Sequence, residues 1–154
     1  MKSVNLLARV MFSMILVIFF LGLDPGVSKA SETYKIGVLQ PFTGVYSIYG
    51  EEAYAACQVA ADQINAAGGV LGRKIELVKK DTKAEVATGV TQAKDMILRD
   101  GVKAIIGPTS SGVLLGVLEV TKEHKILQIS SIANTELATR DRIHPYYFQV
   151  VPNS

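Results

Sequence analysis

The chain has 154 residues, of which 49% are hydrophobic and 19% are charged, and its formal net charge is +2. This length suits one domain, and this composition excludes a disordered chain. The small net charge gives no basic surface for nucleic acid, and the single cysteine, Cys57, excludes an intrachain disulfide.

The first 30 residues have the pattern of a secretory signal peptide. Lys2 and Arg9 precede an almost wholly apolar run, Val10 to Leu23, and small residues, Ser28 and Ala30, stand at the −3 and −1 positions of a cleavage site. The alternative is an uncleaved anchor, but the run is shorter than the roughly 20 apolar residues that span a bilayer. We therefore expect export, with cleavage after about Ala30 and no lipid attachment there, because no cysteine lies near the site.

Removal of this leader changes the charge balance. The leader carries three of the 16 basic residues and one of the 14 acidic residues, so the rest of the chain has equal numbers of each. We expect two regions, a signal peptide at residues 1–30 and part of one domain at residues 31–154.

Short β runs alternate with amphipathic helical runs through residues 31–154. In chain order, the predicted elements are a strand at 34–40, a helix at 51–67, a strand at 74–79, a helix at 86–97, a strand at 102–106, a helix at 113–122, and strands at 126–129 and 146–150. Strands separated by helices of this length indicate right-handed βαβ units. The expected fold class is α/β, with a doubly wound, flavodoxin-like parallel sheet in the order 2-1-3-4-5.

The predicted fifth strand has no helix after it. Pro152 follows it almost directly, whereas a doubly wound sheet needs helices over both faces. We therefore expect the chain to be a fragment or a truncated form of a larger protein.

Three loops rich in small and hydroxyl side chains follow the carboxyl ends of the central strands. Ligands of open parallel sheets bind beyond these ends, where the strand order reverses, here between the first and third strands. The loops are 41–50, 107–112 and 130–135. Ser110 or Ser111 would begin the third helix, whose unpaired N–H groups suit a small anion such as a carboxylate. The alternative is that these serines only cap the helix.

Other motifs do not predict a metal or phosphate site. The stretch Gly69 to Lys74 faintly resembles a phosphate loop, but it lies between a helix and the next strand and lacks the full spacing. Asp81 and Glu85 have no neighbouring histidine or cysteine, so a solvated strand end explains them better. No metal and no cofactor are expected.

The sequence also contains no clear motif for catalytic residues. His124 and His144 have no serine and acid beside them in sequence, and Ser110 lacks the G-x-S-x-G elbow of hydrolases. Cys57 falls on the apolar stripe of its helix, which predicts an inert core residue. We therefore expect a protein that is not an enzyme.

Four stretches of the chain resemble the periplasmic leucine/isoleucine/valine-binding protein family. They are 34–50, 64–74, 104–111 and 144–154. The resemblance follows the whole exported region in order. It implies the solute-binding component of an ABC importer, with two α/β lobes joined by a hinge and the solute in the cleft between them. The chain resembles only the first part of the first lobe.

The resemblance also implies ligand-binding residues. Ser111 matches the family serine whose hydroxyl and N–H hold the α-carboxylate of the ligand, and Ser110 is its neighbour. Tyr49 matches an aromatic residue that lines the side-chain pocket.

In the loop 130–135 the match is less regular. Ile132 matches the residue whose carbonyl binds the ligand ammonium, and the family's Thr or Ser falls on Asn134, or on Thr135 with a one-residue shift. An asparagine at this position weakens the case that the ligand is an ordinary aliphatic amino acid. The acidic residue that holds the ammonium comes from the second lobe, which the chain lacks.

The implied function is periplasmic binding of branched-chain amino acids, or of similar small carboxylates or amides, for delivery to a membrane permease. The alternative is the ligand-binding ectodomain of a sensor or receptor with the same fold. An exported hydrolase is a third interpretation, but it would need a catalytic triad that the sequence does not place.

Overall fold

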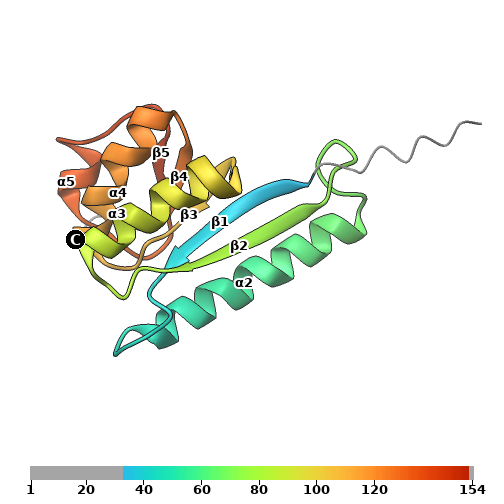
Figure 1. Ribbon diagram of the computed structural model, residues 1–154, viewed down its shortest axis with the longest axis horizontal. Helices are drawn as coiled ribbons and strands as arrows, with labels where there is room; N and C mark the ends of the chain where they lie inside the picture. The colour runs from blue at the N-terminus through green and yellow to red at the C-terminus, as the bar shows by residue number, and fades with distance from the viewer. Residues whose placement is uncertain (1–32, 153–154) are drawn as a thin grey trace, which may run out of the picture. The chain divides into compact units, whose positions relative to one another are not determined.

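The computed structural model describes residues 33–152, so the expected signal peptide and the last two residues lie outside the described part. A five-stranded parallel sheet forms the centre of this region (Figure 1). The elements are β1 (Tyr34–Gln40), α2 (Ser47–Ala66), β2 (Ile75–Asp81), α3 (Val86–Asp95), the π-helical η1 (Met96–Asp100), β3 (Ala104–Ile106), α4 (Ser111–His124), β4 (Leu127–Ser130), α5 (Glu136–Thr139) and β5 (Tyr147–Gln149). The strand order is β2-β1-β3-β4-β5, which confirms the predicted parallel topology.

The helices divide between the two faces of the sheet. In Figure 1, α2 lies along β1 and β2 on one face, and α3 and α4 lie on the other. The main core is on the α3 and α4 side, where side chains from the helices pack on central residues of β1 and β3, among them Met96, Val113, Leu39 and Ile105. A second cluster joins α4 to α5 and β5, through Leu114, Leu118, Ala138 and Tyr147.

Helix α4 behaves as its apolar pattern predicts. Leu114, Val117, Leu118 and Thr121 were expected to face inward, and all four are buried. The helix ends at His124, and the next residue, Lys125, closes it in the left-handed conformation with a φ of 55°. The core therefore holds the start of α4 in a fixed position against the sheet.

Helix α2 departs from the prediction in two ways. It begins at Ser47 rather than at Glu51, because a turn at Gly44 (φ 78°) lets the Ser47 N–H donate to the Gly44 carbonyl and starts the helix early. Cys57 was expected in the core, but it is only half-buried. The reason is that Cys57 lines an open hollow beside α2, together with Ala60 and Ile64, and no other element of the described region fills it.

The short helix α5 was not predicted, since four residues carry too little periodicity for a pattern to show. Within residues 33–152, no helix has both the length and the apolar character needed to cross a membrane.

Candidate ligand-binding site

A cavity of about 400 Å³ opens where the strand order reverses, beyond the carboxyl ends of β1 and β3. Its walls come from the loops that follow β1, β2 and β3. The lining residues are Pro41, Tyr46, Ala84, Thr109, Ser110 and Ser111. Ser110 and Ser111 thus lie in a cavity at the edge of the sheet where doubly wound folds bind ligands.

The amino end of α4 supplies hydrogen-bond donors to this cavity. Ser110 is the residue before the helix, with extended backbone (φ −79°, ψ 125°), and its side chain makes no capping hydrogen bond. The first main-chain bond of the helix runs from the Leu114 N–H to the Ser110 carbonyl at 2.8 Å. The N–H groups from Ser111 to Val113 precede that bond and add to the partial positive charge of the helix end. Chemically, this arrangement suits a carboxylate.

A buried side chain holds the β3–α4 loop in place. Gln40, at the end of β1, is fully buried, and its Oε1 accepts a hydrogen bond of 2.7 Å from the Thr109 hydroxyl. The loop also approaches β1 closely at Gly107, whose φ is 118° and where a Cβ would overlap the Leu39 carbonyl oxygen. The sequence reasoning missed Gln40, although a glutamine at the end of a buried strand was an available signal.

Asp81 fixes the opposite wall of the cavity. Its carboxylate accepts hydrogen bonds from the Phe42 N–H (2.8 Å), the Thr43 hydroxyl (2.7 Å) and the Lys83 N–H (2.8 Å). Burial raises the pKa of this carboxyl, but the hydrogen bonds from Thr43, Lys83 and Phe42 outweigh it and hold the pKa below the ordinary 3.8. Asp81 therefore ties the loop after β1 to the loop after β2.

Two tyrosines near the start of α2 differ in their position relative to the cavity. Tyr49 belongs to the first turn of α2, is 47% exposed and is not in the cavity lining. Tyr46, one turn earlier, lines the cavity instead. The sequence analysis named Tyr49 from the resemblance alone and did not single out Tyr46.

The residues predicted after β4 lie in the loop beside the cavity and not in its lining. Ile132, Asn134 and Thr135 are half-buried, and Thr135 is the residue before α5. The Ser130 hydroxyl donates to the Ala133 carbonyl at 2.7 Å and so folds this loop back on the end of β4. The cavity in this region thus brings together Ser110 and Ser111 but not the other four predicted residues.

Neither histidine lines the cavity. His144 is buried before β5, and its Nδ1 accepts a hydrogen bond of 3.2 Å from the Tyr146 N–H. Burial, and then the charge of Lys122, lower the pKa of His144, which favours the neutral imidazole. Within residues 33–152, no group of three or more His, Cys, Asp or Glu side chains could hold a metal ion.

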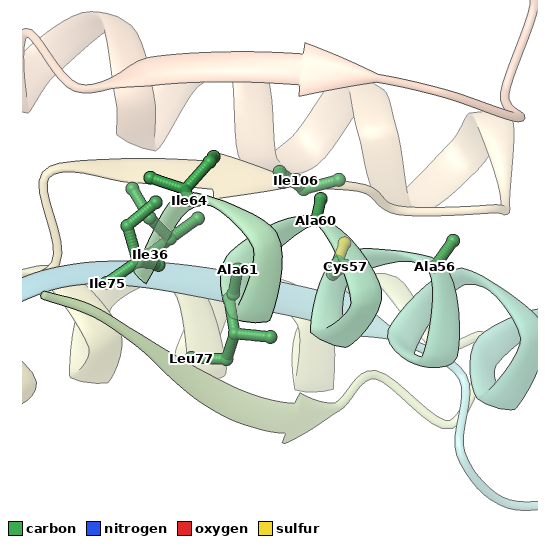
Figure 2. A pocket seen from close by; sticks show the side chains of 9 residues that line it. All are labelled: Ile36, Ala56, Cys57, Ala60, Ala61, Ile64, Ile75, Leu77 and Ile106. Atoms are coloured by element: carbon green, nitrogen blue, oxygen red, sulfur yellow. The ribbon is translucent and has the colours of Figure 1, made fainter. Parts of the chain in front are cut away.

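A second hollow lies on the α2 side of the sheet and has a different chemistry (Figure 2). Its walls are aliphatic side chains of α2 and of β1, β2 and β3, together with Cys57. It offers no charged group to a carboxylate, so it is not a second site for the same kind of ligand.

Residues 33–154 match the family model described as periplasmic binding protein. The chain belongs to this family.

Named relatives of this periplasmic binding protein include the Leu/Ile/Val-binding protein BraC3 of Rhizobium johnstonii. The two are 34% identical over 105 residues, which is 68% of this chain and 28% of the relative. An amino acid binding protein of Pseudomonas aeruginosa is 37% identical over 95 residues, 62% of this chain and 25% of that protein. The chain thus spans about a quarter of the length of these relatives.

Solved structures show the same fold. The LivJ substrate-binding protein of Streptococcus pneumoniae, in complex with isoleucine, has a TM-score of 0.74 and 30% identity, over 79% of this chain and 34% of that one. A solute-binding protein of an ABC transporter from Rhodopseudomonas palustris, in complex with 3,4-dihydroxybenzoic acid, has a TM-score of 0.70 and 27% identity, over 79% and 32%.

Proposed function

We propose that residues 31–154 form the first part of one ligand-binding lobe in a two-lobed solute-binding protein of an ABC importer. The ligand class is branched-chain amino acids or similar small carboxylates. The observation that carries this proposal is the cavity at the amino end of α4, which Ser110 and Ser111 line, because the amino end of a helix favours a carboxylate.

The ligands of the structural relatives support the choice of a carboxylate. Isoleucine and 3,4-dihydroxybenzoic acid differ in almost everything except that each carries a carboxylate. A site whose donors recognise that group alone explains how one fold accommodates both.

The residue roles follow from this chemistry. Ser111 donates its N–H and its hydroxyl to the carboxylate, with Ser110 beside it. Tyr46, which lines the cavity, and Tyr49, in the first turn of α2, contact the ligand side chain. Ile132, Asn134 and Thr135 contribute from the loop after β4. Binding needs no catalytic group, so the protein acts without catalysis.

Export completes the proposal. Residues 1–30 direct the chain to the periplasm, where the loaded protein delivers its ligand to the membrane permease of the importer.

An NMR titration of the chain tests the function. Because one lobe provides only part of a site that encloses its ligand, L-leucine should bind no tighter than about 1 mM, which corresponds to about −4 kcal/mol. We expect L-leucine at tens of millimolar to shift the backbone amide signals from Thr109 to Val113. L-leucinol, which lacks the carboxylate, is the matched control and should leave them unchanged. Equal shifts with both compounds, or shifts confined to other loops, would contradict the proposal.

A further inference from the structure

Gln40, at the carboxyl end of β1, uses only half of its side-chain amide. The residue is fully buried, and its Oε1 accepts the hydroxyl proton of Thr109 at 2.7 Å. Its Nε2 is also buried and has no hydrogen-bond partner among residues 33–152. A buried amide group without a partner costs stability. The contact with Thr109 is therefore the polar interaction that accounts for a glutamine at this position.

The direction of this hydrogen bond decides what Thr109 offers to the cavity. A threonine hydroxyl has one proton and two lone pairs. Because the proton is donated to Gln40, the Thr109 oxygen can only accept a hydrogen bond from a second partner. Thr109 lines the cavity together with Ser110 and Ser111. The cavity thus has an acceptor oxygen next to the donors at the amino end of α4.

The loop that carries Thr109 is held from both neighbouring strands. On the β1 side, a Cβ at Gly107 would lie only 3.0 Å from the Gln40 Nε2. On the β4 side, the fully buried Gln128 donates from its Nε2 to the Gly107 carbonyl at 3.3 Å, and its Oε1 accepts from the Thr121 hydroxyl at 2.8 Å. A loop held in this way has little freedom to turn, so Gln40 sets the orientation of the Thr109 hydroxyl before a ligand arrives.

An acceptor beside a carboxylate site favours a ligand with a donor beside its carboxylate. The ammonium group of an α-amino acid stands on the carbon next to the carboxylate, and it offers N–H donors and no acceptor. A plain carboxylate has no such donor and leaves the Thr109 oxygen without a partner. The cost of an unpaired polar group then counts against the plain carboxylate.

We propose that Gln40 is a positioning residue for ligand selection. By taking the Thr109 hydroxyl proton, it keeps an acceptor in the cavity, and the site therefore prefers a carboxylate with a neighbouring ammonium over a plain carboxylate. Gln40 is buried and is not in the cavity lining, so it acts through Thr109. This inference rests on the proposed function, because it concerns how the same cavity selects its ligand.

NMR titrations of the chain with L-leucine and with 4-methylpentanoate, which is leucine without its ammonium, measure the preference. The wild-type chain should bind leucine at least about fivefold more tightly, because a hydrogen bond to a charged group is among the stronger ones. Gln40→Met keeps the approximate shape of the side chain but removes its acceptor. The Thr109 proton is then free to turn to the cavity, and the ratio of the two affinities should fall to about one.

Gln128→Met is the matched control. It removes the other buried glutamine that holds the loop, but it leaves the hydrogen bond between Thr109 and Gln40 in place. It should lower the thermal midpoint about as much as Gln40→Met does and still keep the preference for leucine. Thr109→Val should abolish the preference and Thr109→Ser should keep it, so the test stays decisive if Gln40→Met does not fold.

The orientation of the Gln40 amide is measured without any ligand. Nuclear Overhauser cross-peaks from its Nε2 protons should be stronger to the Gly107 α protons than to the Thr109 methyl group, since the Nε2 lies on the Gly107 side. Stronger cross-peaks to Thr109 would overturn the inference, because Thr109 would then keep its proton for the cavity.

The titrations separate this inference from the proposed function. If leucine binds but 4-methylpentanoate binds equally well, or if Gln40→Met keeps the wild-type ratio, the inference fails and the proposed function stands. If leucine shifts no signal between Thr109 and Val113 while the cross-peaks are as expected, the proposed function fails and the selectivity fails with it.

Discussion

Single residues at the amino end of α4 would provide the hydrogen-bond donors of the proposed site. Ser111 offers two donors, a hydroxyl from its side chain and an N–H from the helix end, whereas the Ser110 side chain makes no capping bond. A substitution can remove the hydroxyl and keep the N–H, so the two contributions can be separated.

Ser111→Ala in a two-lobed form of the protein should weaken leucine binding by about 10- to 150-fold. The reason is that a hydrogen bond to a charged group contributes roughly 1.5–3 kcal/mol. Calorimetry gives the affinity and a thermal melt gives the stability of the same variant. If affinity stays unchanged while the free energy of unfolding falls by about 1 kcal/mol, Ser111 only supports the helix end.

Asp81 gives a pH-dependent prediction. Its pKa is lowered in the folded state, so its hydrogen bonds contribute stability that is fully present above the ordinary pKa of 3.8 and is lost as the pH falls through the folded value. Asp81→Asn should lower the free energy of unfolding at pH 7 by about 1–2 kcal/mol, a modest amount because the carboxylate is partly exposed. Urea unfolding should show this difference shrinking as the pH is lowered below 3.8. A difference that stays constant with pH would exclude the charge as its source.

At the scale of elements, α2 and α4 are set against the sheet by different contacts. The first turn of α2 is seated where Gly50 meets the Pro41 backbone, and a Cβ there would overlap the Pro41 carbonyl oxygen. Gly112, in the first turn of α4, has only ordinary contacts around a Cβ, the nearest at 3.7 Å. A close backbone contact therefore requires glycine at position 50, whereas position 112 has room for a larger residue.

Gly50→Ala should lower the free energy of unfolding by about 1–3 kcal/mol, because the loop that carries Tyr46 must move to make room. Gly112→Ala is the matched control and should be neutral or stabilising by up to about 1 kcal/mol, since alanine favours helices over glycine. Chemical unfolding of both variants compares them directly. Equal effects would mean that the Pro41 contact does not seat α2.

At the scale of the whole molecule, we propose that the described region provides one side of a ligand site. With a dissociation constant near 1 mM, 1 mM leucine stabilises the fold by about RT ln 2, or roughly 0.4 kcal/mol. A two-lobed form that binds near 1 µM would gain about 4.1 kcal/mol under the same conditions.

Leucine at 1 mM should therefore shift the thermal midpoint of this chain by no more than about 2 °C, and that of a two-lobed form by several degrees more. Differential scanning calorimetry of both forms makes the comparison, with leucinol as the control solute. A large shift for the chain alone would mean that one lobe already encloses the ligand.

Periodicity along the sequence was sufficient for the βαβ order, the parallel sheet and the inward side chains of α4, because short buried strands and amphipathic helices are specified by local patterns of apolar residues. Local patterns also placed Ser110 and Ser111 at a helix start. Only the tertiary structure could place Tyr46 in the cavity lining, pair Gln40 with Thr109 across 69 residues, and leave Cys57 beside the hollow on the α2 side. These depend on where α2 begins and on which elements pack over it, and packing between distant segments leaves no signature in the spacing of neighbouring residues.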